Sequence, residues 1–421
     1  MFAGAVARVH ADAAGRYLPL SALVAGTVPP LIGFAGTVAV VVRAIQVMGG
    51  SPIEIASAIT AMSLAIGVTG GLLSWRWRMP VVLAWSTPGA ALLASSAGSI
   101  PYPVALGVYV VAAALMMAVA ILPWLSRIAS NIPPAIASGM LAGILLPFCL
   151  KLFGAAPLDP ALALAVLGSF LLVRVLAPRH ALSVALLVGI ATLAIRGVLT
   201  NPRHSAAIGA IALHRPEFAL ATSVGLAIPL FMVTLVSQNL PGLVVMHAAG
   251  YHPSARGSFF ATGLATVVAA PFGAFGINLA AIVAALCTGP DAHPNHEKRW
   301  VVGVLYGATW VTLGLFGGVV VSFLTSLPPT VIAVVTGVAL LGPLVGALQA
   351  MVSTGDDLDG PVVTFVATAS GVTLLGIGSA FWGLVAGFLV FGLRKMREGR
   401  RVAAPSVMPP ARHFDIKETQ Q

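Results

Sequence analysis

Apolar stretches of about 20 residues, separated by short polar connections, follow one another along most of the chain. A helix needs roughly 20 apolar residues to cross the hydrocarbon core of a bilayer. By this measure the pattern predicts fourteen membrane-spanning segments. The first seven are expected near residues 20–46, 53–74, 79–98, 103–124, 132–151, 159–177 and 180–198. The second seven are expected near residues 217–247, 254–270, 271–289, 300–324, 327–350, 361–376 and 378–394.

The third and tenth segments are interrupted by residues that break helices. The sequence MPVVLAWSTPGAALLA (79–94) contains Ser-Thr-Pro-Gly, and PFGAFGINLAAIVAA (271–285) is broken in a similar way. Lipid does not tolerate unpaired backbone groups, so such breaks persist only where protein or a water-filled cavity surrounds them. Paired interruptions in the two halves of a chain are typical of a transporter's substrate site. We expect each segment to have an extended approach followed by a half-helix, and the two segments to cross near mid-membrane.

Three pairs of landmarks indicate an internal repeat. The pairs are Pro80 and Pro271, 191 positions apart, Pro133 and Pro328, 195 apart, and the motifs MGGSP (48–52) and AAGYHP (248–253), 201 apart. Such nearly constant offsets are the signature of a repeat. Because seven segments, an odd number, separate the members of each pair, the second half must be inverted relative to the first. The sequence therefore predicts an all-α polytopic membrane protein with a seven-plus-seven inverted repeat.

The distribution of charge predicts the orientation of this fold. With both termini in the cytoplasm, seventeen of the 22 Lys and Arg residues fall on the inner side and five on the outer side. This is the asymmetry that positive residues show in membrane proteins. The predicted organisation is a cytoplasmic N-terminus (1–17), a first repeat (18–198), a linker (199–216), a second repeat (217–394) and a cytoplasmic C-terminal tail (395–421).

Composition excludes several other classes of protein. Of the 421 residues, 58% are hydrophobic and 8% are charged, against roughly a quarter charged in a soluble domain. The net charge of +10 does not indicate nucleic-acid binding, because no basic stripe with interleaved aromatic residues is present. Cys149 and Cys287 lie in apolar runs, which favours buried thiols over a disulfide. The His-containing loop 293–300 lacks the spacing of a metal site, and no cofactor motif or catalytic signature such as GxSxG is present.

The two breaks supply the candidate binding residues. A helix that begins at mid-membrane points unpaired N–H groups and the positive end of its dipole into a cavity, which suits an anion. Ser86 and Thr87, before Gly89, stand where such a helix would begin, and a count of seven residues from Pro80 and from Pro271 matches Thr87 with Asn278. The other candidates are Gly276 in the second break, the polar pair Gln238 and Asn239 in the eighth segment, and the aromatic residues Phe34, Trp85 and Phe275 as the walls of a slot for a ring.

Acidic residues are absent from the centres of the segments, and this bears on cargo and coupling. An intramembrane carboxylate is the usual mark of a cation site or proton relay. Its absence favours an organic anion as the cargo. We expect a coupling proton to travel close to the substrate, on the substrate's own carboxyl group or on His247 at the end of the eighth segment.

At these residues the chain resembles the BenE-type benzoate/proton symporters of bacteria. The resemblance runs from about residue 18 to 394 and is carried by RMPVVLAWSTPGAALLA (78–94), QNLPG (238–242), APFGAFGINLAAIVAALCTGPDAHP (270–294) and LLGIGSAFWGLVAG (374–387). It implies proton-driven uptake of benzoate or a similar aromatic carboxylate in the bacterial inner membrane, and it leaves homodimers open. It also implies the fold of the uracil and anion transporters, in which segments one to four and eight to eleven form a core that moves against a gate formed by the others.

Two other functions remain as alternatives. A transporter of the same fold could carry another organic or inorganic anion or a nucleobase. Nucleobase carriers of this fold use glutamates in the eighth and tenth segments, where this chain has Gln238, Asn239 and Asn278, and this disfavours a nucleobase. An intramembrane enzyme is a distant alternative, since no catalytic constellation is visible.

Overall fold

The computed structural model describes residues 19–96, 100–123, 133–177, 181–197, 209–319, 322, 327–353, 358–374 and 379–403. In the first half the elements are α2 (Leu20–Val47), α3 (Pro52–Trp77), β1 (Leu83–Trp85), α4 (Thr87–Ser95), α5 (Tyr102–Ile121), α7 (Pro134–Ala155), α8 (Pro160–Leu176) and α9 (Ala181–Ile195). In the second half the eighth segment runs without a break through α10 (Leu220–Thr222), η2 (Ser223–Ala227), α11 (Ile228–Thr234), η3 (Leu235–Asn239) and α12 (Leu240–Ala248). It is followed by α13 (Ala255–Ala269), η4 (Ala270–Phe272), β2 (Ile277–Leu279), α14 (Ala281–Thr288), η5 (His296–Lys298), α15 (Trp300–Leu315), α17 (Pro329–Val352), α18 (Asp359–Ala369) and α19 (Ser379–Ala403).

These elements coincide with the segments expected from the apolar pattern. Seven helices in the described part of the chain are long and apolar enough to cross a membrane, and the shorter helices and the two strand–helix units occupy the other expected segments. Two ends differ clearly. The α18 helix ends at Ala369, earlier than expected, because Gly371 takes a left-handed φ of 68°. The α19 helix continues to Ala403, so the first part of the expected C-terminal tail is helical.

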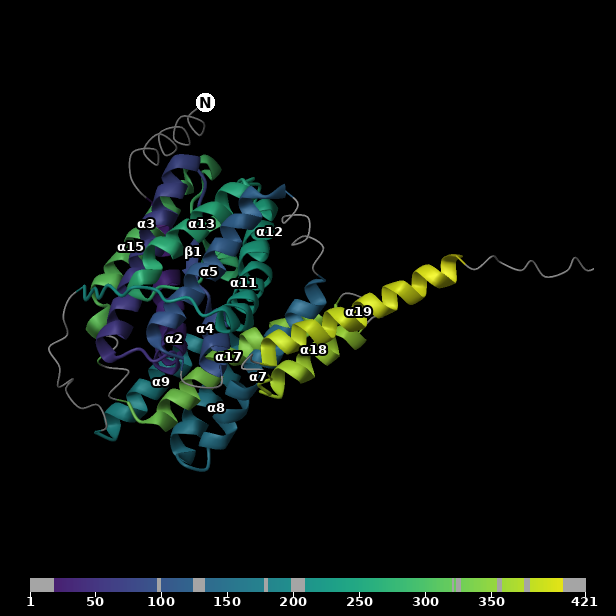
Figure 1. The fold of residues 1–421 in the computed structure, drawn as a ribbon. Coiled ribbons are helices and arrows are strands. Elements are labelled where there is room, and N and C mark those ends of the chain that lie inside the picture. Colours follow the sequence, from purple (N-terminus) through teal and green to yellow (C-terminus); the bar gives the residue numbers. More distant parts are fainter. Residues whose placement is uncertain are drawn as a thin grey trace, which may run out of the picture.

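The helices form two bundles, which Figure 1 shows as a large group above and a smaller one below and to the right. The core bundle consists of α2 to α5 and α10 to α15, and the second bundle of α7 to α9 and α17 to α19. In the core bundle α3 packs on α15, α5 on α13, α2 on α4 and α12 on α14. In the second bundle α7 packs on α17 and α18, α8 on α9 and α17, and α18 on α19.

This packing has the symmetry of an inverted repeat. The counterparts in the two halves are α2 and α12, α3 and α13, α4 and α14, α5 and α15, α7 and α17, α8 and α18, and α9 and α19. When each element is exchanged for its counterpart, the α3–α15 contact becomes α13–α5 and the α2–α4 contact becomes α12–α14. The exchange also turns α8–α9 into α18–α19 and α7–α18 into α17–α8, and all of these contacts are present. The two strands run antiparallel, as an inverted pair must. The fold is therefore built from two halves related by an approximate two-fold axis.

The first helix of each half ends in the same turn. Gly49 and Gly250, 201 positions apart, both have a φ of 82°. The N–H of Gly50 donates to the Ile45 carbonyl oxygen at 2.9 Å, and the equivalent N–H, that of Tyr251, donates to Met246 at 2.9 Å. Only glycine adopts this left-handed conformation without strain, so the glycines in MGGSP and AAGYHP reflect a shared helix end.

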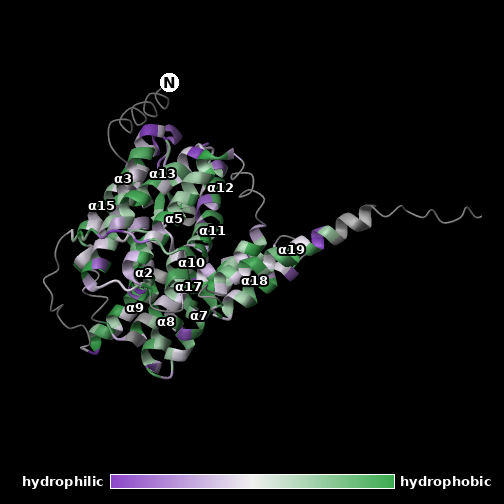
Figure 2. Cartoon of the chain, viewed as in Figure 1, coloured by the Kyte–Doolittle hydropathy of each residue, from purple (hydrophilic) through white to green (hydrophobic). Residues whose placement is uncertain are grey.

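Hydrophobic residues predominate in the helices, as the colours of Figure 2 show, while clearly hydrophilic residues lie near the top of the core bundle and part of the way along α19. On the second bundle many large apolar side chains face outward, among them Leu164 and Leu172 with 72% and 62% of their surface exposed. Exposure of this extent is expected of a surface that contacts lipid.

An extended segment at residues 209–219, here called the strap, leads from the first half into the second. It crosses the core bundle as the teal segment of Figure 1. The Gly209 N–H donates to Leu315 at 3.0 Å, the His214 N–H to Pro271 at 2.9 Å and the Glu217 N–H to Pro103 at 2.9 Å. The strap therefore belongs to the core bundle. Residues 199–208 of the expected linker lie outside the described residues, as do the expected N-terminus at 1–17 and the tail beyond residue 403.

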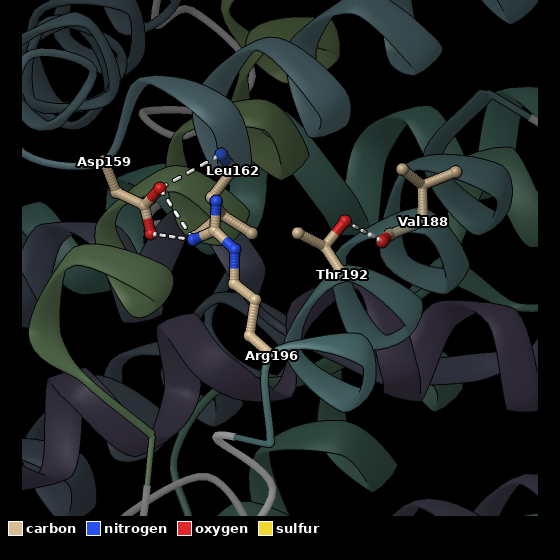
Figure 3. Close-up of polar contacts among 5 residues, drawn as sticks. All are labelled: Asp159, Leu162, Val188, Thr192 and Arg196. Carbon is tan, nitrogen blue, oxygen red and sulfur yellow. Dashed lines mark hydrogen bonds and ion pairs between the residues drawn. The ribbon is translucent and has the colours of Figure 1, made fainter.

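An ion pair closes the α8–α9 hairpin of the second bundle (Figure 3). Asp159 precedes α8 and accepts a hydrogen bond from the Leu162 N–H at 3.1 Å, which caps the helix. Arg196, at the end of α9, donates from one nitrogen to both Asp159 oxygens at 2.9 and 2.8 Å. The hydrogen bond from Arg196 lowers the pKa of the Asp159 carboxyl group below its ordinary value, against a smaller opposing effect of burial.

Candidate functional site

The two interrupted segments meet in the interior of the core bundle. β1 pairs with β2 in antiparallel register, with Leu83 opposite Leu279, Ala84 opposite Asn278 and Trp85 opposite Ile277. Helix α4 begins two residues after β1, and α14 begins two residues after β2. The N-terminal ends of two short helices, of 9 and 8 residues, are thereby brought to the same place from opposite directions.

The backbone of this break is hydrogen-bonded throughout the approach. The Ser86 N–H donates to the Gly276 carbonyl oxygen at 2.8 Å, and the Ala280 N–H donates to Val82 at 2.9 Å. Hydroxyl groups of the preceding helices hold the strands: Ser74 exchanges hydrogen bonds with the backbone of Val81 at 3.0 Å. Thr266 accepts from the Ile277 N–H at 3.2 Å. These bonds meet the requirement that buried irregular backbone be satisfied within the protein.

Ser86 is the N-cap of α4. Its hydroxyl oxygen accepts a hydrogen bond from the Gly89 N–H at 2.9 Å, and the side chain is fully buried. Pro88 has no N–H, and the Ala90 N–H is already bonded to the Ser86 carbonyl oxygen. Thr87 differs from these residues, because it is only half-buried and no hydrogen bond of its N–H or hydroxyl is recorded within the described residues. Thr87 is therefore the first-turn residue of α4 with donors to offer.

The expected match between Thr87 and Asn278 is wrong. Asn278 lies within β2, opposite Ala84, and the N-cap of α14 is Ala280, which makes no side-chain cap. Counting from the prolines fails because the second segment takes a longer path. A turn of 3-10 helix at Ala270–Phe272 and a left-handed Gly273 precede β2, which adds three residues that the first segment lacks. The structural equivalent of Ser86 is thus Ala280.

Asn239 and Asn278 join the eighth segment to the break. The Asn239 side-chain amide donates to the Asn278 side-chain oxygen at 3.0 Å, and its own oxygen accepts from the Leu279 N–H at 3.1 Å. Asn278 in turn donates to the Gly276 carbonyl oxygen at 2.5 Å. Both side chains are buried. Asn239 ends a π-helical turn, a feature that often occurs at functional sites.

Two further candidates lie at the more open side of this network. Gln238 is half-buried and has no recorded hydrogen bond within the described residues. Gly276 is also half-buried, with a φ of 57°. A Cβ atom on Gly276 would lie 2.9 Å from the Ser86 Cβ and 3.6 Å from Thr234, a residue that the sequence did not single out. Thr87, Gln238 and Gly276 are the expected residues that remain partly accessible.

The three expected aromatic residues are buried behind the break. Phe34 and Trp85 form one cluster with Trp310, with ring centroids 4.8 to 5.9 Å apart. The Trp85 indole N–H donates to the Thr37 hydroxyl at 2.8 Å. Phe275 packs on Tyr109 at 5.2 Å. Trp310, Thr37 and Tyr109 could not be found from the sequence, because each comes from a helix whose neighbours only the fold reveals.

No acidic or basic side chain stands in β1, α4, β2 or α14, so within these elements the electrostatic field at the break comes from backbone dipoles. The described residues contain no group of three or more His, Cys, Asp or Glu that could hold a metal ion. At the far end of α14 the buried Arg299 donates to the Thr288 carbonyl oxygen at 2.8 Å and to the His293 carbonyl oxygen at 2.8 Å. A cation there complements the negative end of the helix dipole. Burial lowers the pKa of the nearby His293, which favours its neutral form.

A narrow crevice lies between the two bundles, beside the C-terminal end of α4. It is lined by hydroxyl groups that include Ser95, Ser96 and Thr222 from the core bundle and Thr373 and Ser379 from the second bundle, and its volume is about 50 Å³. Space of that size holds water molecules but no aromatic acid. A larger cavity of about 470 Å³ between α3 and α13 is lined by apolar residues and by Thr69, and no charged side chain lines it.

Known proteins match the chain over most of its length. The family model described as "Benzoate membrane transport protein" matches residues 16–393. The inner membrane protein YdcO of Escherichia coli (strain K12) is 39% identical over 376 residues, which cover 88% of this chain and 95% of that protein. The benzoate membrane transport protein of Acinetobacter baylyi is 35% identical over 372 residues, which cover 88% and 94%.

Solved structures share the fold at low sequence identity. The transmembrane domain of a cyanobacterium bicarbonate transporter, BicA, has a TM-score of 0.53 over 84% of this chain and 96% of that chain, at 14% identity. Murine Slc26a9, an anion transporter in its inward-facing state, has a TM-score of 0.57 over 91% and 70%, at 13% identity. The chain is thus a multi-pass membrane protein with the seven-plus-seven inverted-repeat fold of these transporters. By the family match and the two relatives, the chain belongs to the benzoate membrane transport protein family, which is a family of transporters and not of enzymes.

Proposed function

We propose that the chain is a secondary active transporter that imports benzoate or a similar aromatic carboxylate together with protons. The substrate carboxylate is held between the N-terminal ends of α4 and α14, and alternating access arises from movement of the core bundle against the second bundle. Membership of the benzoate transport family and the name of the Acinetobacter baylyi relative support the cargo. The orientation that follows from the charge asymmetry has both termini in the cytoplasm, with α4 ending on the outer side.

The observation that carries this proposal is the paired start of two short helices inside the core bundle. Their N-terminal ends supply partial positive charge and unpaired N–H groups, which bind an anion without an ionised side chain. When such a site is empty, it contains no unpaired buried cation, whose burial would be unfavourable. In this proposal Thr87 and Gln238 donate to the carboxylate, and the backbone at Gly276 lies beside it.

Ring selectivity in this proposal rests on the apolar aromatic residues around the break. Phe34, Trp85 and Phe275 are buried against the strands within the core bundle, so they shape the apolar side of the site through the strands that they support. Ser86, Asn239 and Asn278 act on the substrate indirectly, because their side chains hold the strands and the first turn of α4 in place.

Uptake of radiolabelled benzoate into proteoliposomes tests this function. With the membrane voltage clamped at zero and the outside acidic, purified protein should raise the initial uptake rate well above that of protein-free vesicles, which report passive permeation of the neutral acid. Unlabelled benzoate in excess should compete, whereas uracil and bicarbonate should not. Uptake equal to that of protein-free vesicles at every pH would overturn the proposal.

A further inference from the structure

A carboxylate and an imidazole meet at the end of the core bundle where α3 begins. One oxygen of Glu54 lies 3.1 Å from the His214 Nε2, and the two side chains are 14% and 35% exposed. The other Glu54 oxygen accepts a hydrogen bond from the Ser51 N–H at 2.6 Å as part of a capping box. The cap thus fixes the carboxylate and leaves one oxygen for the imidazole. The sequence did not reveal this pair, because His214 is brought to α3 only by the course of the strap.

Among the residues that the structure describes, Tyr102 is a further titratable group in contact with the pair. The Tyr102 ring, from α5, lies edge-on to the His214 ring at 5.5 Å. Arg215 and Glu217 belong to the strap itself and are exposed, and the turn at residues 270–273 has no titratable side chain. When His214 takes up a proton, the pair changes from one net negative charge to none.

Two buried hydroxyl groups lead inward from the pair toward the substrate break. Those of Tyr102 and Tyr109 are buried and have no hydrogen-bond partner within the described part of the chain. The two residues lie seven positions apart on α5, which places them on the same face about 10 Å apart along the axis. The Tyr102 hydroxyl oxygen lies so close to Gly273 that a Cβ atom there would overlap it, and the Tyr109 ring packs on Phe275, the residue before Gly276. Buried hydroxyls are hydrogen-bonded in native proteins, to water where no protein group serves.

Within the described residues, the equivalent position at the other end of the core bundle lacks this arrangement. Ser254 caps α13 as Ser51 caps α3, but Gly257 stands where the first half has Glu54. The space beside Gly257 is filled by the Trp77 side chain. In the orientation given by the charge asymmetry, the Glu54 end faces outward, the side from which an importer takes its protons.

We propose that Glu54 and His214 form the proton-uptake site of the transporter, and that Tyr102 and Tyr109 conduct the proton to the substrate carboxylate. His214 takes a proton from the outer solution, with its charge balanced by Glu54. Water molecules span the roughly 10 Å between the two hydroxyls in this proposal. Each hydroxyl and each of these waters accepts one proton and donates one, so that the carboxylate gains a proton and His214 returns to the neutral form. One proton and one carboxylate then move together. This inference rests on the proposed function.

The test separates substrate binding from proton supply. Glu54→Gln, His214→Gln and Tyr109→Phe should bind benzoate, measured by tryptophan fluorescence of the purified protein, within about twofold of the wild type. Their initial uptake rate in proteoliposomes should fall about tenfold at an outer pH of about 7.5, where protons are scarce, and much less at about 5.5. His214→Gln leaves the capping box intact, so it remains informative if Glu54→Gln fails to fold. Glu217→Gln, an exposed carboxylate on the same strap, is the matched control and should change neither quantity.

Each contrary result has its own meaning. Variants that take up benzoate at the wild-type rate at both pH values would overturn the proton-uptake site and leave the proposed function intact. Variants whose benzoate affinity falls as much as their uptake would overturn it as well, since the pair would then act on binding. A wild-type protein that binds no benzoate would overturn the proposed cargo, and this inference with it.

Discussion

Thr87 carries two hydrogen-bond donors at the start of α4, its N–H and its hydroxyl, and no hydrogen bond of either is recorded within the described residues. Its neighbour Ser86 also has a hydroxyl group, but the oxygen of that group accepts the hydrogen bond of the Gly89 N–H. The difference arises because the N-cap position aims a hydroxyl back at its own helix, whereas the next position aims it outward. At the scale of single residues, the proposed carboxylate site thus depends on which of two adjacent hydroxyls is the cap.

Thr87→Val should weaken benzoate binding by about 10- to 150-fold, the effect of removing one hydrogen bond to a charged group. The fold should be unaffected, since the hydroxyl has no hydrogen-bond partner among the described residues. Equilibrium binding to the purified protein measures the change. Thr312→Val is the control, because that hydroxyl is exposed and bonds only to Ala308 of its own helix. An unchanged dissociation constant for Thr87→Val would remove this residue from the site.

Gly276→Ala should damage the break itself. The residue has a φ of 57°, and the added Cβ would lie 2.9 Å from the Ser86 Cβ, so strain and overlap act together. We expect a midpoint of thermal unfolding several degrees below that of the wild type and a loss of benzoate binding. Gly71→Ala, on α3 with no atom within 4 Å of the added Cβ, should behave like the wild type. Equal thermal stability of the two variants would contradict the assigned strain.

At the scale of elements, sequence patterns predicted the breaks but not their connections. Ser-Thr-Pro-Gly and the glycines around Phe275 interrupt apolar runs, and this is a local property that can be read directly. The pairing of β1 with β2 is not local, and the three extra residues before β2 misaligned Asn278 with Thr87. The role of Asn239 as the bond between η3 and β2 also depends on distant contacts. The sequence therefore indicated where the candidate site lies. Which of its residues caps a helix, and which connects the strands to the eighth segment, could be seen only in the fold.

The α8–α9 hairpin provides a prediction about pH. Because the pKa of Asp159 is lower in the folded protein than in the unfolded chain, its ion pair stabilises the fold above about pH 4 and is lost as pH falls through the folded value. Asp159→Asn keeps the helix cap but removes the charge. Both partners are partly exposed, so the loss at pH 7 should be at most about 1 kcal/mol.

Thermal unfolding of the Asp159→Asn variant in detergent measures this difference. The gap between the wild type and the variant should shrink as the pH is lowered below about 4. Asp291→Asn, which removes an exposed carboxylate from a loop, serves as the control and should leave the midpoint unchanged at each pH. A gap that stays constant down to the lowest pH would show that the Asp159 charge does not act through its ionised form.

At the scale of the whole molecule, the crevice between the bundles reports on their movement. Ser95→Cys places a thiol on its core-bundle wall, and the native Cys149 and Cys287 are buried and should contribute little background. Saturating benzoate should slow modification of this thiol several-fold if substrate draws the two bundles together over the site. Ser353→Cys, exposed at the end of α17 and outside the crevice, should be modified at a rate that benzoate does not change. A Ser95→Cys rate equally indifferent to benzoate would argue against closure at this place.

The correspondence between the two halves implies the shape of a second state. If each half adopts the backbone arrangement now seen in the other, the crevice closes at the end of α4 and an equivalent one opens at the opposite face. When the matched helices of the two halves are aligned, the counterpart of Ser95 is Gly289, that of Thr222 is Ser21, and that of Ser379 is Ala181. Gly289, Ser21 and Ala181 should then line the mouth through which the cargo leaves. That mouth would carry one hydroxyl where the entrance has several, so the same anion should be held less firmly on its way out.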